Sequence, residues 1–404
     1  MRKFALPIVL LISVAVFGLW LFSAHGVSKT MRLVRSFIAT EGMTTGMSPA
    51  DLLPLDDGGY LLVADAIEAA AAIIRTDKDG KPIWRREIAP AEKVDTGAEA
   101  RYTSLAKLSD GTFIACGQMP RARPSKRAGL LTRFTQDGQI ISNTLVYPKN
   151  DPGYFSALIQ CIPSRDGAIL LGGATLFRER KPGEEPGQAQ DVFYWLTSIA
   201  ADGGVRWDSL IPSNIRTSSW GGQGELEIVP HPSGSGFVIK ASLEPAQTEL
   251  LHVDDNGNEV RRRDIPRRTY VLVQPHVPTK EIILITRGMP DLGVWRLDGD
   301  FKEIGSFETD SSRAMITKAF LVSDGSIVTI GEKRTWDGVR LSQVLRIDLS
   351  RRAAGVLSIE NEEVAYVPYA ASVLTGDRLA IVMSMIHGAQ LKFDIVSFKS
   401  HITE

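Results

Sequence analysis

Net charge, histidine clusters and glycine-rich phosphate loops are missing from this sequence, and each absence excludes a class of function. Lysine and arginine number 46 against 47 aspartates and glutamates, so the net charge is −1 and gives no electrostatic reason to expect a nucleic acid partner. The six histidines are scattered, with no H-E-x-x-H or H-x-H spacing. No P-loop or dinucleotide-binding glycine pattern occurs either. We therefore predict no metal site, no cofactor and no nucleic acid partner.

Catalytic and calcium-binding patterns are also incomplete. Ser235 lies in Gly234-Ser235-Gly236, which is not the G-x-S-x-G setting of a hydrolase nucleophile, and no base can be named for it. Asp77-Lys78-Asp79-Gly80 begins like a calcium loop but lacks the bidentate glutamate that such loops need. The sequence predicts no catalytic residue, and it favours a protein that works by binding.

Cysteine is scarce, and none lies directly after the apolar segment at the start of the chain, which argues against a lipid-modified N-terminus. The two cysteines, Cys116 and Cys161, each lie in an apolar strand, where a free cysteine packs as a small hydrophobe. A disulfide between them is permitted outside the cytoplasm. The sequence leaves open whether the two residues pair.

The start of the chain is a targeting segment outside the fold. Arg2 and Lys3 precede residues 4–22, which carry no charge. This length exceeds a secretory h-region of about 7–15 residues and approaches the ~20 residues that span a bilayer. We predict that residues 1–30 form an anchor and linker, which hold the body, 31–404, in the periplasm at a bacterial inner membrane. A weak cleavage site at Ala24-His25-Gly26 leaves open a cleaved signal peptide and a secreted protein.

What the sequence has in abundance is one repeated phrase. Its clearest copy is Leu53-Pro54-Leu55-Asp56-Asp57-Gly58-Gly59-Tyr60-Leu61-Leu62-Val63-Ala64, in which a turn separates two apolar strands. Asp-Gly between apolar runs predicts a two-residue hairpin, because both residues tolerate the positive φ that such turns need. Seven copies of this first turn align, at Asp57-Gly58, Asp110-Gly111, Asp166-Gly167, Ser233-Gly234, Thr279-Lys280, Asp324-Gly325 and Gly376-Asp377.

The strands after these turns are continuous apolar runs, for example Tyr60–Ala64 and Ile327–Ile330. Such a run indicates cover on both faces, as in a blade between two neighbouring blades. We therefore predict an all-β fold, a seven-bladed β-propeller preceded by one N-terminal transmembrane helix. The seventh copy lacks a fourth strand, and Met31–Ile38 looks like the strand that follows each second turn. We expect residues 31–38 to pair with residues 390–398 and to close the ring.

These turns resemble the D-G-G-Y repeats of secreted and periplasmic bacterial β-propellers. Two copies, Asp79-Gly80-Lys81-Pro82-Ile83-Trp84 and Asp202-Gly203-Gly204-Val205-Arg206-Trp207, also look like the D-G-x-x-x-W turns of quinoprotein-type propellers and of an outer-membrane assembly lipoprotein. The resemblance covers residues 31–403, although the other copies lack the tryptophan. It implies that Trp84 and Trp207 dock one blade on the next. It supports the fold strongly and the function hardly at all.

The two faces of the predicted propeller differ. In an antiparallel meander the Asp-Gly turns lie at one end of each blade, and the second and fourth connections lie at the other. The long insertions all fall in the second and fourth connections, at Ala89–Arg101, Gln118–Ala128, Leu176–Asp191, Pro212–Gly224 and Glu332–Leu341. Long loops on a rigid scaffold commonly carry binding residues, so we expect the functional site on this face. The candidate residues are basic or aromatic: Arg121, Arg123, Lys126, Arg127, Arg178, Arg180, Arg216, Trp220, Arg334 and Trp336.

These candidates suit an anionic ligand or a protein partner, although nearby glutamates offset part of the charge and plain solvated loops are the alternative. We expect a non-catalytic, extracytoplasmic binding or scaffold protein that engages a protein partner. An envelope complex subunit and a periplasmic inhibitor or immunity protein are two forms of this function. Two other functions stay open. One is a propeller enzyme, either quinone-dependent or hydrolytic, and the other is a polysaccharide-binding module that stacks sugars on Trp220 and Trp336.

Overall fold

The structure is a computed structural model of the chain, and it describes the strands and most of the tight turns between them. The described residues are 32–39, 48–65, 71–88, 100–120, 127–149, 155–164, 167–177, 190–200, 203–217, 225–244, 247–266, 270–275, 279–286, 291–310, 315–334, 340–359, 366–374, 378–385 and 391–397. Segment 4–22, which we predict to cross a membrane, lies outside them. Within the described ranges, no helix has the length and apolar character that a membrane crossing requires.

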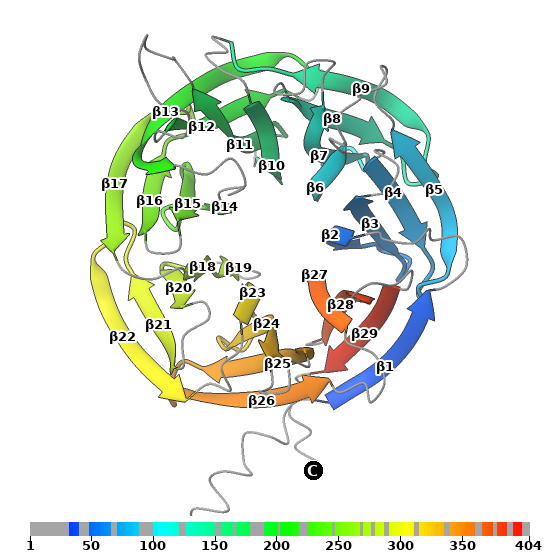
Figure 1. Cartoon of the computed structure of the whole chain (residues 1–404), viewed down its shortest axis with the longest axis vertical. Coiled ribbons are helices and arrows are strands. Elements are labelled where there is room, and N and C mark those ends of the chain that lie inside the picture. Colours follow the sequence, from blue (N-terminus) through cyan, green and yellow to red (C-terminus); the bar gives the residue numbers. More distant parts are fainter. Residues whose placement is uncertain are drawn as a thin grey trace, which may run out of the picture.

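The strands form seven antiparallel blades around a central axis, with the first strand of each blade innermost (Figure 1). Blade 1 contains β2 (Ser48–Pro54), β3 (Tyr60–Asp65), β4 (Ala71–Thr76) and β5 (Pro82–Ile88). Blade 2 contains β6 (Arg101–Lys107), β7 (Phe113–Pro120), β8 (Arg127–Phe134) and β9 (Ile140–Val146). Blade 3 contains β10 (Phe155–Pro163), β11 (Ile169–Phe177), β12 (Gln190–Ile199) and β13 (Val205–Thr217).

The remaining blades continue the same order round the ring. Blade 4 contains β14 (Glu225–Pro230), β15 (Phe237–Glu244), β16 (Gln247–Val253) and β17 (Glu259–Pro266). Blade 5 contains β18 (Tyr270–Leu272), β20 (Ile282–Thr286), β21 (Asp291–Leu297) and β22 (Glu303–Asp310). Blade 6 contains β23 (Met315–Leu321), β24 (Ile327–Arg334), β25 (Arg340–Asp348) and β26 (Ala353–Ile359). The short strand β19 (Gln274–Pro275) pairs in parallel with β23 and links blade 5 to blade 6.

Blade 7 is built from both ends of the described chain. Its inner three strands are β27 (Tyr366–Leu374), β28 (Arg378–Met385) and β29 (Leu391–Ser397), and its outer strand is β1 (Arg32–Ala39). β1 pairs antiparallel with β29, from Arg32 opposite Ser397 to Ala39 opposite Leu391. The pairing brings the first and last strands together in Figure 1, and β1 covers the outer edge of β29.

The core lies between the blades, because the apolar runs of the second and third strands are covered on both faces. Leu61 and Val63 of β3 pack with Tyr102 of blade 2. Leu62, which lies between them in sequence, packs with Val382 of blade 7. Alternate side chains of one strand therefore enter two different inter-blade clusters, as expected for a blade enclosed by neighbours.

The tight turns differ from the two-residue hairpins that Asp-Gly predicts. In blade 1, Gly58 N donates to Leu55 O at 3.0 Å, and Leu55 N donates to Gly59 O at 2.9 Å. Gly58 has φ of +84°, whereas Asp57 is not among the residues with positive φ. The loop is therefore a type I turn followed by a left-handed glycine, which is the common three-residue hairpin. Asp57 supports it through Oδ1, which accepts a hydrogen bond from Gly59 N at 3.0 Å.

The second turn of blade 5 is displaced from the Asp298-Gly299 pair. Phe301 N donates to Asp298 O at 3.0 Å, and Phe301, with φ of 62°, takes the left-handed position that glycine holds in other turns. This conformation is costly for a bulky residue. Phe301 is buried in the apolar cluster between blades 4 and 5, so side-chain burial offsets the backbone strain.

Two tryptophans dock one blade on the next, as the resemblance implies. Trp84 Nε1 donates to Gln136 O at 3.1 Å, and the indole lies against Gly138, where a Cβ would come within 2.9 Å of the ring. Trp207 makes the equivalent contact between blades 3 and 4, with Gly257 so close that a Cβ would lie 2.5 Å from the ring. These glycines are needed both for their positive φ and for the close approach of the ring.

Candidate functional site

The inner strands of all seven blades enclose a central channel with a cavity of about 400 Å³. Five of these strands, β2, β6, β10, β23 and β27, contain a β-bulge at the same position along the strand. A bulge re-aims the neighbouring side chains and increases the local twist. The residues directly after the first four bulges are polar and line the channel: Asp51, Ser104, Gln160 and Lys318.

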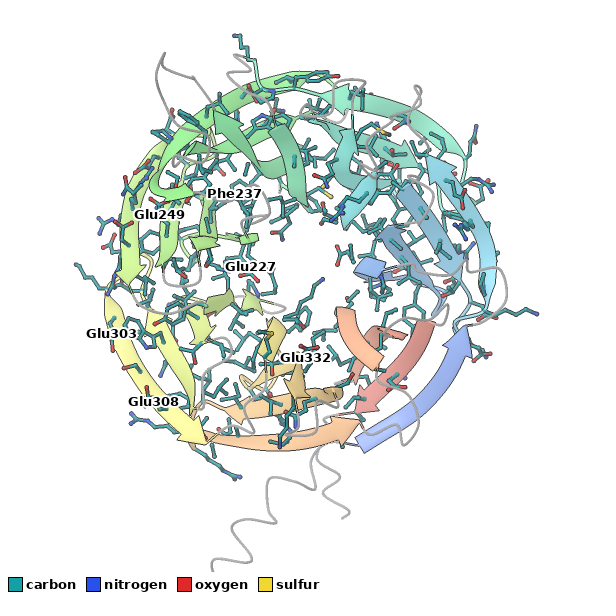
Figure 2. The ribbon with its side chains drawn as sticks, viewed as in Figure 1. Glu227, Phe237, Glu249, Glu303, Glu308 and Glu332 are labelled. Atoms are coloured by element: carbon teal, nitrogen blue, oxygen red, sulfur yellow. The ribbon has the colours of Figure 1, made fainter. Side chains whose placement is uncertain are left out.

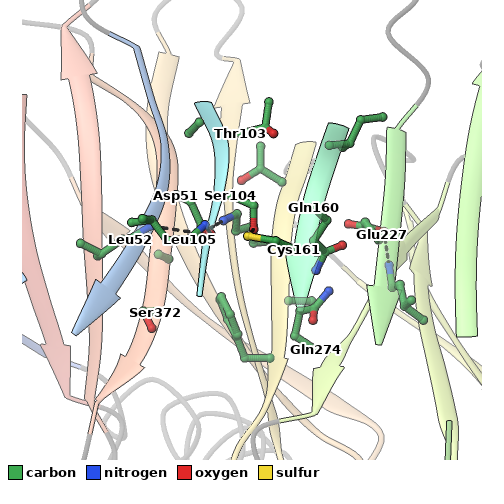
Figure 3. Close-up of a pocket in the computed structure, with 18 of the residues that line it drawn as sticks. Asp51, Leu52, Thr103, Ser104, Leu105, Gln160, Cys161, Glu227, Gln274 and Ser372 are labelled. Atoms are coloured by element: carbon green, nitrogen blue, oxygen red, sulfur yellow. Dashed lines mark hydrogen bonds and ion pairs between the residues drawn. The ribbon is translucent and has the colours of Figure 1, made fainter. Parts of the chain in front are cut away.

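Polar side chains at this level bind the backbone of the next blade. Asp51 Oδ2 accepts a hydrogen bond from Leu105 N at 2.9 Å. Gln160 Oε1 accepts one from Ile228 N at 2.7 Å, and its Nε2 donates to Ile228 O at 3.1 Å. These bonds run from blade 1 to blade 2 and from blade 3 to blade 4, and Figure 3 shows Asp51, Leu105 and Gln160 on the channel wall. Side chains of the inner strands thus link neighbouring blades along the channel wall.

Glu227 repeats this arrangement at the junction of blades 4 and 5, although β14 has no bulge. Its Oε2 accepts a hydrogen bond from Leu272 N at 2.7 Å and lies 3.1 Å from Lys240 Nζ. The Lys240 side chain is fully buried, so this ion pair is largely removed from water. Figure 2 places Glu227 toward the centre of the ring, and Figure 3 shows it on the channel wall.

A second ion pair crosses the inner strand of blade 7. Lys318 Nζ of blade 6 lies 3.0 Å from Asp51 Oδ1 of blade 1. Blade 7, between them, presents Ala370 and Ala371 at this level, and these short side chains leave room for the bridge. Each carboxylate of the channel wall that the structure describes therefore has a lysine partner.

Both cysteines are free thiols beside the channel. Cys161 lines the cavity, and its Sγ lies 3.7 Å from Ser104 Oγ. Cys116, the cross-strand neighbour of Ser104, is fully buried. Burial raises the pKa of the Cys116 thiol well above its usual value, and the Cys161 thiol beside it raises it further. Cys161 is 3% exposed, and it is the one of the two cysteines that lines the cavity.

The candidate residues chosen from the sequence fall into two groups. Arg127 begins β8, Arg216 is next to last in β13, and Arg334 ends β24. The antiparallel order puts these three positions at the same end of the blades, opposite the tight turns; we call it the long-connection face. The other seven lie outside the described residues: Arg121, Arg123, Lys126, Arg178, Arg180, Trp220 and Trp336.

The strands extend into the predicted insertions, most of all into the one at Pro212–Gly224. β13 continues to Thr217, so Pro212 lies inside the strand and pairs with Phe193 rather than starting a loop. A register shift between Asp191 and Phe193 accommodates the longer outer strand.

No group of three or more histidine, cysteine, aspartate or glutamate side chains in the described ranges could hold a metal ion.

Two stacked histidines join blade 4 to blade 5 on the tight-turn face. The rings of His231 and His252 lie 3.7 Å apart and nearly parallel, with 4° between their planes. His231 Nε2 is 2.9 Å from Gly299 O of blade 5, and its Nδ1 is 2.7 Å from Ser233 Oγ. Burial lowers the pKa of His252, and the neighbouring His231 lowers it further.

This pair predicts a loss of stability in mild acid. The pKa of His252 in the folded protein lies below its ordinary value of 6.5, so the unfolded chain binds the proton more readily. The contribution of neutral His252 to stability is complete above about pH 6.5, and it is lost as the pH falls toward the pKa of His252 in the folded protein. We expect the midpoint of thermal unfolding to fall between pH 7 and pH 5, and the decline to be smaller in His252→Gln. Equal slopes in the two proteins would contradict this assignment.

The candidates chosen from the sequence do not include the channel residues, although the sequence contains a pattern that marks them. Each is a polar residue inside an otherwise apolar first strand, a few residues before the first turn, as in Asp51-Leu52-Leu53 and Glu227-Ile228-Val229. A half-buried strand with an isolated carboxylate indicates a side chain that needs partners. Aligning the first strands at their turns places Asp51, Gln160, Glu227 and Lys318 at one level.

No protein-family model matches the sequence, and no curated protein matches it. Solved structures match it in fold. The Dos1 propeller superposes with a TM-score of 0.53 at 10% sequence identity, over 94% of this chain and 98% of that one. BBS1N, solved in complex with ARL6DN, gives a TM-score of 0.52 at 9% identity, over 93% and 99% of the two chains. A protein of unknown function from Dyadobacter fermentans gives 0.49 at 13% identity, over 91% and 99%.

At such low identities these likenesses establish the fold alone. The chain is a seven-bladed β-propeller with distant similarity to several propellers. They identify no repeat family, so the D-G-G-Y resemblance remains a likeness of turns.

Proposed function

We propose that this protein is a non-catalytic, extracytoplasmic binding or scaffold protein that engages a protein partner through its long-connection face. In this proposal residues 4–22 hold the propeller at a bacterial inner membrane, with the body in the periplasm. The observation that carries the proposal is the placement of β1, because it puts the chain before Arg32 at the tight-turn face, opposite the long-connection face.

The direction of β1 supports this assignment. β29 runs toward the tight-turn face and ends at Ser397, and Arg32 pairs with Ser397. The chain before Arg32 therefore joins the propeller at the tight-turn face. Arg127, Arg216 and Arg334 lie at the opposite end of their strands. A propeller tethered by residues 4–22 would present the long-connection face away from the membrane, where a partner can reach it.

A photo-crosslinking amino acid placed at single positions of the full chain in cells tests this proposal. Arg216 and Arg334 sample the long-connection face, and Lys78 and Lys302, which are exposed next to tight turns, are the matched controls. We expect one covalent adduct of defined mass from the first pair and none from the second. Adducts from the tight-turn positions alone, or from neither face, would refute the proposal.

Charge-reversal variants measure how much the two arginines contribute to binding of the partner. Arginine is enriched among interface residues that contribute about 2 kcal/mol or more each, so if only one of the two is such a residue, Arg216→Glu combined with Arg334→Glu is expected to weaken binding of the crosslinked partner by roughly thirtyfold. Lys78→Glu combined with Lys302→Glu carries the same charge change on the tight-turn face and should leave capture unchanged. Equal effects of the two double variants would show a general electrostatic attraction rather than a docking face.

A further inference from the structure

Lys318 is a cation on the wall of the central channel, and its hydrogen-bonding capacity is only partly used. Lys318 lines the cavity and its side chain is 28% exposed. A lysine ammonium has three donors. Within the described part of the chain, the partner recorded for Lys318 is Asp51, at 3.0 Å. Two N–H groups of the ammonium are therefore available to an acceptor inside the channel.

Asp51 and Glu227, the carboxylates of the channel wall, have more hydrogen-bond and ion-pair partners than Lys318. Asp51 accepts hydrogen bonds from Leu52 N at 3.0 Å, from Leu105 N at 2.9 Å and from Lys318 Nζ. Glu227 is held by Leu272 N and by the buried Lys240. Backbone donors already stabilise both carboxylates. A ligand with a hydrogen-bond acceptor that binds Lys318 is therefore favoured over a cation that binds the carboxylates.

The space beside Lys318 suits a small polar molecule. The cavity of about 400 Å³ lies within the range of roughly 300–1,000 Å³ that small-molecule sites occupy. Blade 7 lines it with Ala371 and Ser372, which are short, and Gln274 lines it from the strand that links blades 5 and 6. The Ser372 hydroxyl and the Gln274 amide can each donate and accept a hydrogen bond. Figure 3 shows these side chains on the channel wall with Asp51 and Glu227.

We propose that the central channel binds small carboxylate-bearing molecules, with the carboxylate on the Lys318 ammonium and the polar remainder on Gln274 and Ser372. A singly charged carboxylate fits better than a phosphate dianion, because Asp51 and Glu227 on the same wall repel a higher negative charge. The site lies inside the ring and is independent of the long-connection face, so each proposal can fail without the other.

Titration calorimetry of the full chain with glucuronate and with glucose tests the recognition of a carboxylate, since the two sugars differ at one carbon. Acetate extends the series as a second singly charged carboxylate, and citrate and inorganic phosphate test more highly charged anions. We expect millimolar or tighter binding of glucuronate, and weaker binding of glucose, citrate and phosphate. Loss of a charged hydrogen bond in Lys318→Met is expected to weaken binding roughly ten- to hundredfold. Lys302→Met, on the tight-turn face, is the matched control and should bind normally.

Alkylation of the two cysteines locates the bound molecule. Peptide mapping after treatment with iodoacetamide reports Cys161, on the channel wall, separately from the fully buried Cys116. Glucuronate is expected to slow modification of Cys161 in the native chain and not in Lys318→Met. The proposal is overturned if no carboxylate binds at millimolar concentration, if Lys318→Met binds as well as the natural chain, or if glucose or phosphate binds more tightly than glucuronate. Binding without protection of Cys161 would place the carboxylate outside the channel and would also overturn it.

Discussion

Replacing Glu249 by alanine is expected to lower the free energy of unfolding by about 3–5 kcal/mol, the usual cost of removing one partner from a buried ion pair. The carboxylate is fully buried in blade 4, and Arg262 Nη1 lies 2.6 Å from its Oε1. Its oxygens also accept hydrogen bonds from Ser213 Oγ at 2.9 Å, from Asn214 N at 3.1 Å and from the Tyr194 hydroxyl. Glu249→Ala would remove the buried one of the two carboxylates that pair with Arg262, and it would leave several donors of blade 3 without their acceptor.

The Glu249 cluster joins two blades, which is why the effect is large. Ser213, Asn214 and Tyr194 belong to blade 3, whereas Glu249 and Arg262 belong to blade 4. Burial and the nearby Glu249 raise the pKa of Tyr194, so its hydroxyl remains a donor throughout the neutral range. Figure 2 shows Glu249 farther from the ring centre than Glu227, in the body of blade 4. The network therefore closes the blade 3–blade 4 junction at a distance from the channel.

Urea unfolding provides the measurement, and Glu259→Ala is the matched control. Glu259 pairs with the same arginine, with Nη2 2.7 Å from its Oε2, but its side chain is 34% exposed. Partly exposed pairs contribute about 0–1 kcal/mol, so this control should shift the midpoint little. A Glu249→Ala shift no larger than that of Glu259→Ala would show that the buried cluster does not hold the junction.

The repeated turns explain how much of the fold is predictable from sequence. Gly58 and Gly111, with φ of +84° and +83°, mark where first strands end, because few other residues adopt that conformation. The apolar run after each turn then predicts a strand covered on both faces. The prediction of a two-residue hairpin was wrong, because Asp57 and Gly58 form the last two positions of a three-residue loop. Local sequence locates such a turn more readily than it distinguishes hairpin lengths that share the Asp-Gly pair.

The channel and the inter-blade clusters are harder to predict, because their members come from distant parts of the chain. Asp51 and Lys318 are 267 residues apart, and the local bond from Leu52 N to Asp51 gives no indication of the bridge. Phe301 in a left-handed conformation is also invisible to local rules, since burial in the core overrides the preference of the backbone. For the long-connection face, the length and composition of the connections indicated the candidates, and the backbone positions of three of them lie at one end of the blades.

Removing β1 is expected to abolish cooperative folding of the ring. β1 is held to β29 over seven paired positions. At about 1 kcal/mol of net stabilisation per backbone hydrogen bond, loss of even five bonds costs roughly 5 kcal/mol, which is comparable to the total stability of many domains at about 5–15 kcal/mol. The bared edge of β29 would also offer unpaired N–H and C=O groups to a second chain. We expect a chain lacking residues 32–39 to associate or unfold.

Light scattering and urea unfolding distinguish the outcomes of this deletion. A chain in which residues 32–39 are replaced by glycine and serine of equal length keeps the connection to the N-terminal segment, and it should behave like the deletion. A synthetic peptide of residues 31–39 added to the deleted chain should restore a monomer with a cooperative transition, because it can repair the β29 edge. If the deleted chain stayed monomeric with the natural midpoint, the ring would not depend on this strand, and blade 7 would be stable with three strands. Rescue by the peptide, in contrast, would show that joining the two ends of the chain is what holds the seven blades in one closed body.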